Sequence, residues 1–205
     1  MSKFLELKNI SKTFEENKKL QVIKNLSYNF NKGKIYSLMG PSGSGKSTLL
    51  NLISLIDRPS SGSIKFNNYQ INYDEKEEND ILRSKKIGIV YQQNNLLPDF
   101  TAIENIYLAS LSINNDKDLA ISKAKKLLKV IGLFNRADYY PSQLSGGEAQ
   151  RIAIARAIIN DPEIILADEP TGSLDMKTAK DIFNLLKNQK RSDRLIIFAT
   201  HNRFF

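Results

Sequence analysis

The stretch GPSGSGKST, residues 40–48, decides how this chain of 205 residues is expected to fold. It follows an apolar run, residues 34–39, and opens a second one, residues 47–56, so that a strand, a glycine-rich loop and a helix succeed one another. Glycines let the backbone curl until successive amides and the helix N-terminus face a phosphate group. A chance glycine-rich turn would lack the flanking strand and helix. We therefore interpret the stretch as a P-loop that binds a nucleotide.

Two side chains of the P-loop carry most of its chemistry. Lys46 adds a positive charge toward the β- and γ-phosphate oxygens, and the hydroxyl of Ser47 is expected to coordinate Mg²⁺. The predicted nucleotide-binding residues of the loop are Gly40, Pro41, Ser42, Gly43, Ser44, Gly45, Lys46, Ser47 and Thr48.

A second motif, IILADE at residues 164–169, is an apolar strand that ends in two carboxylates. From the end of a strand Asp168 can reach the Mg²⁺ shell, and Glu169 can polarise an attacking water molecule. The alternative is a buried strand followed by an acidic turn without function. The P-loop in the same chain favours the functional interpretation.

A third motif, LSGGE at residues 144–148, precedes a helix-forming stretch, residues 149–160. Ser145 and the following glycine amides would lie at a helix N-terminus, which suits an anion. Alone, this motif would be read as a glycine-containing helix cap. A chain with two anion-binding helix starts needs a reason for the second.

Short apolar runs alternate with longer helical patterns along the rest of the chain, which predicts an α/β fold. A P-loop core with a mostly parallel sheet is accompanied by an antiparallel N-terminal β portion, since Asn67-Asn68 joins two short strands as a hairpin would. The range from about 94 to 147 has helical patterns and no convincing strand, so we interpret it as an inserted α-helical lobe. The expected strands are residues 4–10, 22–30, 34–39, 64–66, 87–92, 164–167 and 195–199, and the clearest helices are residues 47–56, 118–131 and 175–190.

Composition excludes several classes of protein. The chain has no cysteine and one histidine, so neither a disulfide framework nor a thiolate metal site can form and a zinc centre is not expected. No apolar run approaches the roughly 18 residues that a membrane-spanning helix needs. The net charge of +8 is spread over scattered lysines, which is typical of a solvated surface more than of a nucleic-acid or lipid site.

These motifs, in this order and over nearly the whole chain, resemble those of the ABC ATPase family. Besides the P-loop, LSGGE and Asp168-Glu169, the resemblance includes Gln92 after a strand, Ser173-Leu174-Asp175, and His201 after a strand. It implies an ATP-hydrolysing subunit in which two copies pack head to tail. Each ATP would lie between the P-loop of one copy and the signature of the other, formed by Leu144, Ser145, Gly146, Gly147 and Glu148.

The resemblance also implies roles for single residues. Gln92 would sense Mg²⁺ and the membrane partner, Asp175 would connect the two sites of the dimer, and His201 would contact the γ-phosphate. Phe14 is the best candidate for an aromatic ring stacked on adenine, although it could equally be a core residue. Catalysis is assigned to Glu169 and His201, and the metal to Ser47, Gln92 and Asp168.

Within the family, residues 91–105 resemble the lipoprotein-releasing branch, whereas LADEPTGSLD, residues 166–175, is shared with cell-division and macrolide-export relatives. We therefore expect a peripheral subunit on the cytoplasmic face of a bacterial inner membrane. It would contact the membrane only through transmembrane permease subunits and power the release of lipoproteins. The alternatives are a cell-division ATPase that regulates cell-wall hydrolysis and a macrolide-type exporter.

Residues 1–205 are expected to form one ATPase domain, with a core of residues 1–93 and 148–205. Such ATPases usually continue past the histidine, so the C-terminal end is either truncated or unusually short. DNA-repair and chromosome-maintenance relatives are not expected, because they insert a very long coiled coil between the glutamine and the signature. No nucleic-acid partner is therefore predicted.

Overall fold

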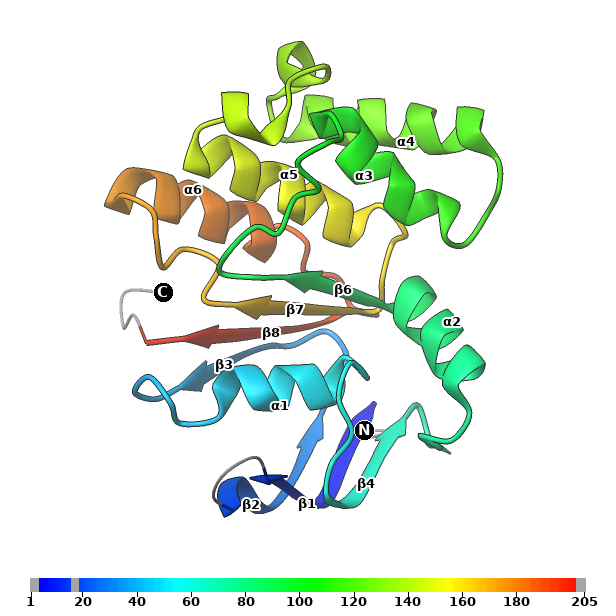
Figure 1. Ribbon diagram of the computed structural model, residues 1–205, viewed down its shortest axis with the longest axis vertical. Coiled ribbons are helices and arrows are strands. Elements are labelled where there is room, and N and C mark those ends of the chain that lie inside the picture. The colour runs from blue at the N-terminus through cyan, green and yellow to red at the C-terminus, as the bar shows by residue number, and fades with distance from the viewer. Residues whose placement is uncertain (1–3, 16–18, 202–205) are drawn as a thin grey trace.

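The computed structural model describes residues 4–15 and 19–201, which form two four-stranded sheets with helices around them (Figure 1). The order of strands is β2-β1-β4-β5 in one sheet and β3-β8-β7-β6 in the other. Figure 1 shows helix α1 between the two sheets and helices α5 and α6 on the opposite side of the second sheet. The predicted α/β fold class, with an antiparallel and a parallel portion, is confirmed.

The first sheet is antiparallel. Its central strand β1 pairs with β2 on one side and β4 on the other, so that Leu5 lies opposite both Phe30 and Phe66. The turn from β4 to β5 is made by Asn67 and Asn68, whose φ angles of 50° and 68° are those of a tight hairpin. This confirms the predicted hairpin. The strands are β1 (Leu5–Glu15), β2 (Lys19–Phe30), β4 (Ser61–Phe66) and β5 (Tyr69–Gln70).

The second sheet is parallel, and its two central strands are almost fully buried because helices cover both faces. All four strands run in the same direction, so their carboxyl ends meet at one edge, where the loops that follow β3, β6, β7 and β8 come together. Ligands bind at this edge in open parallel sheets. The strands are β3 (Ile35–Met39), β6 (Ile87–Val90), β7 (Ile164–Asp168) and β8 (Leu195–Thr200).

Three apolar clusters hold these layers together. The first lies between α1 and the two sheets, the second between the parallel sheet and helices α5 and α6, and the third among α3, α4 and α5. No helix of residues 4–15 and 19–201 is long and apolar enough to cross a membrane. The helices are α1 (Lys46–Ile53), α2 (Lys76–Lys86), α3 (Ala102–Leu111), α4 (Lys117–Val130), α5 (Gly146–Ile158) and α6 (Met176–Lys187), with 3₁₀ turns η1 (Phe134–Arg136) and η2 (Pro141–Gln143).

Two helices end earlier than the sequence pattern predicts. α1 stops at Ile53, and Leu55 turns the chain with a φ angle of 61°, so the prediction that the helix reaches residue 56 is wrong. α6 stops at Lys187, ahead of the predicted residue 190. The division into a core and a lobe at residues 94–147 stays a prediction, although α3, α4, η1 and η2 fall within that range.

Candidate functional site

A cleft of about 760 Å³ opens where the P-loop meets the edge of the parallel sheet and the first two strands. It collects residues from segments that are far apart in the sequence, and most of the residues predicted for the site are among them. The cleft is lined by Phe14, Leu20, Val22, Pro41, Ser42, Gly43, Gly45, Lys46, Ser47, Thr48, Gln92, Glu169 and His201.

The P-loop curls between β3 and α1. Gly43 and Gly45 have φ angles of 78° and 86°, a region in which a residue with a Cβ atom is strained, so the curl depends on glycine here. Lys46 begins α1 and is buried, and its Nζ donates to the carbonyls of Gly40 and Pro41 at 2.9 Å each. The ammonium group is therefore held over the concave side of the loop, where it can meet phosphate oxygens.

Glu169 stands at the centre of the charged end of the cleft. Its Oε1 lies 3.8 Å from Lys46 Nζ, and its Oε2 lies 2.8 Å from Nδ1 of His201. Its φ angle of 43° is unusual for a residue other than glycine, and its amide donates to the Ala199 carbonyl at 2.8 Å. The loop thus leaves the strand at a sharp angle and turns the carboxylate into the cleft.

Asp168 precedes Glu169 and suits a metal ion. Its Oδ1 is buried and has no hydrogen-bond partner in the described part of the chain. Burial raises the pKa of Asp168, while a hydrogen bond from Ser47 acts in the opposite direction. A carboxylate and a hydroxyl oxygen are ligands that Mg²⁺ prefers, and Mg²⁺ usually takes its other ligands from water and substrate phosphates. The residues present therefore fit the ion.

Gln92 lies in an irregular loop after β6 and reaches the same cleft. Gly172, which the sequence analysis did not single out, faces it: a Cβ atom at this position would lie 3.0 Å from Nε2 of Gln92 and 3.4 Å from Oε2 of Glu169. Any larger residue at Gly172 would crowd both side chains. The only sign of this role in the sequence is that a glycine follows the two carboxylates after a few residues.

The other end of the cleft is apolar. Phe14 on β1 is 38% exposed, and Leu20 and Val22 on β2 line the cleft beside it. Nζ of Lys12 lies 4.9 Å from the centre of the Phe14 ring, within the range of a cation–π contact. Leu20 and Val22 were missed by the sequence analysis, because apolar residues in a strand give no sign of facing a ligand instead of the core.

The signature, residues 144–148, forms a separate site. Ser145 caps α5: its Oγ accepts from the amide of Glu148 at 3.3 Å, and its own amide donates to Oε2 of Glu148 at 2.8 Å. These hydrogen bonds, the one from the Ser145 amide above all, lower the pKa of Glu148, which also pairs with Arg136. No residue of the signature is among the described residues that line the cleft.

Asp175 lies next to the signature instead of in the cleft. Its Oδ1 caps α6 by accepting from the amides of Lys177 and Thr178, each at 3.0 Å. Hydrogen bonds from the side chain of Thr178, and then from its amide, lower the pKa of Asp175 most. A Cβ atom at Gly147 would lie 2.5 Å from Cγ2 of Thr178. The start of α5 and the start of α6 therefore approach so closely that only glycine fits at residue 147.

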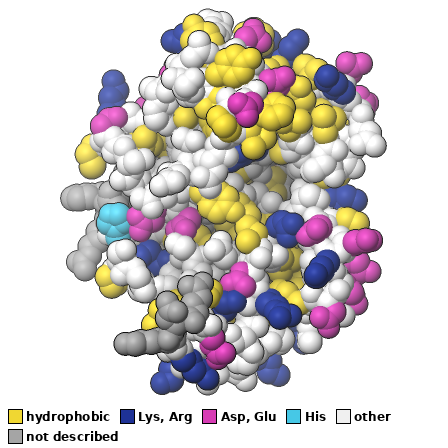
Figure 2. All heavy atoms as spheres, in the orientation of Figure 1, with side chains coloured by type: hydrophobic (Ala, Val, Ile, Leu, Met, Phe, Trp, Pro, Cys, Tyr) yellow, Lys and Arg dark blue, Asp and Glu magenta, His cyan; other side chains and the backbone are white. Residues whose placement is uncertain are grey.

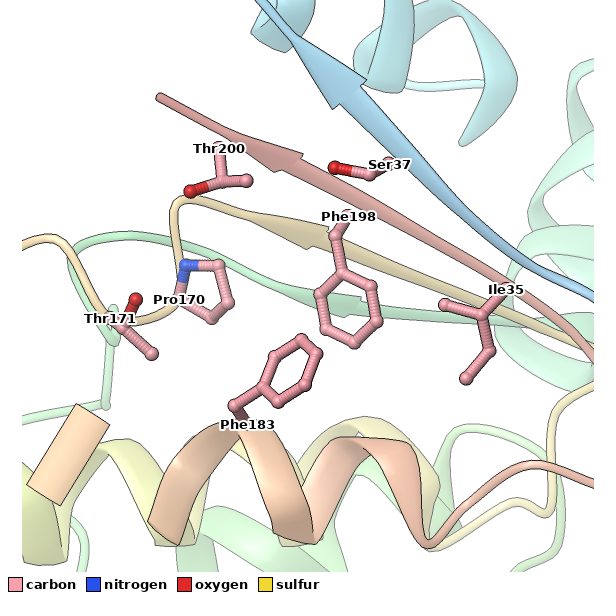
Figure 3. A pocket seen from close by; sticks show the side chains of 7 residues that line it. All are labelled: Ile35, Ser37, Pro170, Thr171, Phe183, Phe198 and Thr200. Atoms are coloured by element: carbon pink, nitrogen blue, oxygen red, sulfur yellow. The ribbon is translucent and has the colours of Figure 1, made fainter. Parts of the chain in front are cut away.

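A smaller cavity of about 140 Å³ lies behind the loop that carries Glu169 (Figure 3). Figure 3 shows the rings of Phe183 and Phe198 next to each other, beside Pro170. Their centres are 5.3 Å apart and their planes are tilted by 39°. The lining has three hydroxyl groups and no charged side chain, so the cavity does not suit a polyphosphate. Its residues are Ile35, Ser37, Pro170, Thr171, Phe183, Phe198 and Thr200.

This chain is similar to known proteins of one family. The model of the ABC transporter family matches residues 23–172. The lipoprotein-releasing system ATP-binding protein LolD of Rickettsia bellii is 44% identical over 203 residues, which cover 98% of this chain and 90% of the relative. The protein of the same name from Ehrlichia ruminantium (strain Gardel) is 45% identical over 204 residues, with 98% and 90% covered.

Among solved structures, a similar one is the dimeric, post-hydrolysis state of the ATP-binding cassette MJ0796 bound to ADP and Pi. The two chains share 40% sequence identity and superpose with a TM-score of 0.89, over 97% of this chain and 88% of the other.

Proposed function

The chain belongs to the ABC transporter family of ATP-binding proteins, and on this premise we propose that it powers the release of lipoproteins from a bacterial inner membrane. The observation that supports ATP hydrolysis is the cleft, because the P-loop, Glu169, Gln92 and His201 all line it. The similarity to proteins named for lipoprotein release supports the cargo.

In the proposed reaction the P-loop amides and Lys46 bind the β- and γ-phosphates, and Phe14 stacks on the adenine. Glu169 polarises the attacking water, because its carboxylate projects into the cleft next to Lys46. His201 contacts the γ-phosphate and steadies the Glu169 carboxylate, 2.8 Å away. When bound, Mg²⁺ would be held by Ser47, Asp168 and Gln92 and would neutralise charge on the phosphates.

Two copies of the chain are proposed to share each ATP. The signature at the start of α5 is outside the cleft of its own chain, so its capped helix start is available to the nucleotide of a second copy. The dimeric state of a cassette with 40% identity supports this arrangement. ATP would then close the dimer, and hydrolysis would permit it to open again.

A groove of about 290 Å³ is the proposed contact for the permease subunits. It lies between β6, α2, α3 and α5, and Tyr91, the residue before Gln92, is part of its wall. A segment bound in the groove would therefore contact Tyr91, which directly precedes Gln92 of the ATP cleft. Its lining includes Ile56, Arg83, Ser112, Ala157 and Pro162.

The test is purification of the tagged chain from detergent-solubilised membranes, followed by identification of its partners. We expect permease subunits with a large periplasmic domain, and accumulation of lipoproteins in the inner membrane when the chain is depleted. Ser112→Arg, in the groove, should abolish this association, whereas Ser122→Arg, exposed on α4, should preserve it. A partner that regulates cell-wall hydrolases, or a macrolide exporter, would overturn the proposed cargo.

A further inference from the structure

The ammonium group of Lys12 lies against the ring of Phe14. Nζ of Lys12 is 4.9 Å from the centre of the ring, and the side chain of Lys12 is only 11% exposed. Phe14 lines the ATP cleft, whereas Lys12 is not among the described residues that do so. The cation therefore occupies the face of the ring that is turned away from the cleft, and the opposite face is left for a base.

Lys12 is itself fixed by the segment that follows α1. Its Nζ donates to Oδ1 of Asp57 at 2.6 Å and to the carbonyl of Arg58 at 3.0 Å. The amide of Asp57 donates in turn to the carbonyl of Asn51, inside α1, at 3.2 Å. The ammonium group is thus anchored to the end of the helix that begins in the P-loop.

Strand β1 is irregular where it carries these two side chains. Its pairing with β2 shifts register on both sides of Lys12, and such irregularities change the direction in which a side chain points. The hydroxyl of Ser60 accepts from the amide of Thr13 at 3.0 Å, and the amide of Ser60 donates to the carbonyl of Ser11 at 2.8 Å. These bonds from Ser60 hold Lys12 and Phe14 in an arrangement that the pairing with β2 alone does not determine.

An ammonium group behind the ring favours stacking in two ways. It limits the rotation of the Phe14 side chain, which is 38% exposed, so less conformational entropy is lost when a base binds. It also draws π-electron density toward itself, so the opposite face of the ring becomes less negative and attracts an electron-rich purine more strongly. Both effects need the positive charge of Lys12, and both act on the base instead of the phosphates.

We propose that Lys12 is a positioning residue for the base of the nucleotide: its ammonium group, anchored by Asp57, holds the Phe14 ring in the orientation that stacks on adenine. The proposal rests on the proposed ATP binding and deepens it by naming what positions the adenine contact. Lys12 acts through Phe14 and does not touch the nucleotide. The alternative is an ion pair that only stabilises the fold.

The test measures the Kd for ATP in Lys12→Met, which keeps most of the length of lysine and removes the charge. We expect the Kd and the KM to rise about fivefold, part of the value of a base–aromatic stack, while kcat changes less than about twofold because the base is remote from the reacting phosphate. The Ki of inorganic tripolyphosphate, which has no base, should stay unchanged. Lys12→Arg keeps a cation that can stack on the ring and pair with Asp57, so it should retain the affinity of the unaltered chain.

A double-mutant cycle tests whether Lys12 acts through Phe14. Phe14→Ala should raise the Kd for ATP about tenfold or more. Adding Lys12→Met to this variant should have almost no further effect. Asp57→Asn leaves the lysine in place without its anionic partner and should weaken ATP binding in the same direction, which provides a second variant if Lys12→Met folds poorly.

Lys32→Met is the matched control. Nζ of Lys32 lies 4.4 Å from the centre of the Phe4 ring and 2.8 Å from Oε2 of Glu163, so Lys32 has the same kinds of contact as Lys12. None of these three residues is among the described ones that line the cleft. Lys32→Met should therefore lower the thermal midpoint and leave the Kd for ATP unchanged.

Three results would overturn the proposal: an unchanged Kd for ATP in Lys12→Met, an equal rise of the Kd with and without Phe14→Ala, or a rise in the Ki of tripolyphosphate as large as that in the Kd for ATP. Failure of the proposed function is distinguishable, because it would appear as the absence of ATP binding and turnover in the unaltered chain.

Discussion

At the scale of single residues, Glu169 combines several structural features that a turn without a function would not need. It takes a φ angle of 43°, it lies between Lys46 and His201, and its carboxylate remains 15% exposed. Asp168 beside it is half-buried, with a buried Oδ1 that has no hydrogen-bond partner among the described residues, and burial raises its pKa. Adjacent carboxylates in such different environments are typical of a site in which one group binds a cation and the other handles a proton.

Glu169→Gln is expected to retain ATP binding and to lose hydrolysis about a hundredfold or more, because glutamine keeps the shape but cannot accept a proton. Single-turnover hydrolysis and equilibrium binding of a fluorescent ATP analogue measure the two effects separately. Glu77→Gln, exposed on α2, is the control and should be unaffected. Near-normal turnover in Glu169→Gln would remove this residue from the role.

At the scale of elements, the sequence predicts best where apolar periodicity and a motif coincide. β3, the P-loop and α1 form one such unit, and β7 with its carboxylates forms another. Helix α2 was not predicted, since among its eleven residues only Ile81 and Leu82 are apolar and they form no stripe. The hydrogen bonds from α5 to residues 91–95 were not predictable either, because they join positions about 60 apart through side chains.

The contact between α5 and α6 gives a prediction at this scale. Gly147→Ala would place a Cβ atom 2.5 Å from Cγ2 of Thr178 and should destabilise the chain by about 1–3 kcal/mol through overpacking. Gly146→Ala is the matched control, because its Cβ atom would have an ordinary contact at 3.6 Å with Leu174. Urea unfolding measures the free energy of unfolding of both variants.

Thr178→Ser removes the methyl group that causes the clash, so it should restore most of the stability of Gly147→Ala. If the double variant is as unstable as Gly147→Ala alone, the close approach of the two helices is not the cause of the loss.

At the scale of the whole molecule, a few polar contacts connect segments that lie outside the three apolar clusters. Glu163, just before β7, pairs with Lys32 at 2.8 Å and with Lys86 at 2.6 Å. It thereby connects the approach to β3 with the end of α2. Figure 2 shows Lys and Arg side chains distributed among Asp and Glu on one face of the molecule.

The Glu163 contacts predict a dependence on pH. Burial raises the pKa of Glu163, but the hydrogen bonds and charges of Lys32 and Lys86 outweigh it and bring the pKa below its ordinary value of 4.5. A carboxyl group whose pKa is lowered by folding stabilises the folded chain above pH 4.5. This contribution to the free energy of unfolding is lost as the pH falls through the folded-state pKa. Glu163→Gln should therefore cost about 1 kcal/mol at pH 7 and almost nothing near pH 3. Urea unfolding at both pH values measures this, and an equal cost at both would contradict the ion-pair explanation.

Shared sites predict complementation between two inactive chains. Lys46→Ala damages the P-loop and Ser145→Arg damages the signature, so a mixed head-to-tail dimer contains one site with both defects and one intact site. Turnover of the mixture should rise well above that of either variant alone, and it should fall on dilution. Activity of the unaltered chain that stays proportional to concentration down to high dilution would contradict shared sites.

The apolar end of the cleft has a consequence for the choice of nucleotide. Phe14, Leu20 and Val22 offer a flat ring and aliphatic carbons to the base, and their side chains have no hydrogen-bonding group that distinguishes an amino from a keto substituent. Selectivity for one purine needs such groups, whereas stacking accepts either. GTP should therefore be hydrolysed at a rate similar to that of ATP, and the cellular abundance of ATP, more than the protein, would determine which nucleotide it uses. A GTP turnover more than about a hundredfold slower would show that a polar contact to the base exists.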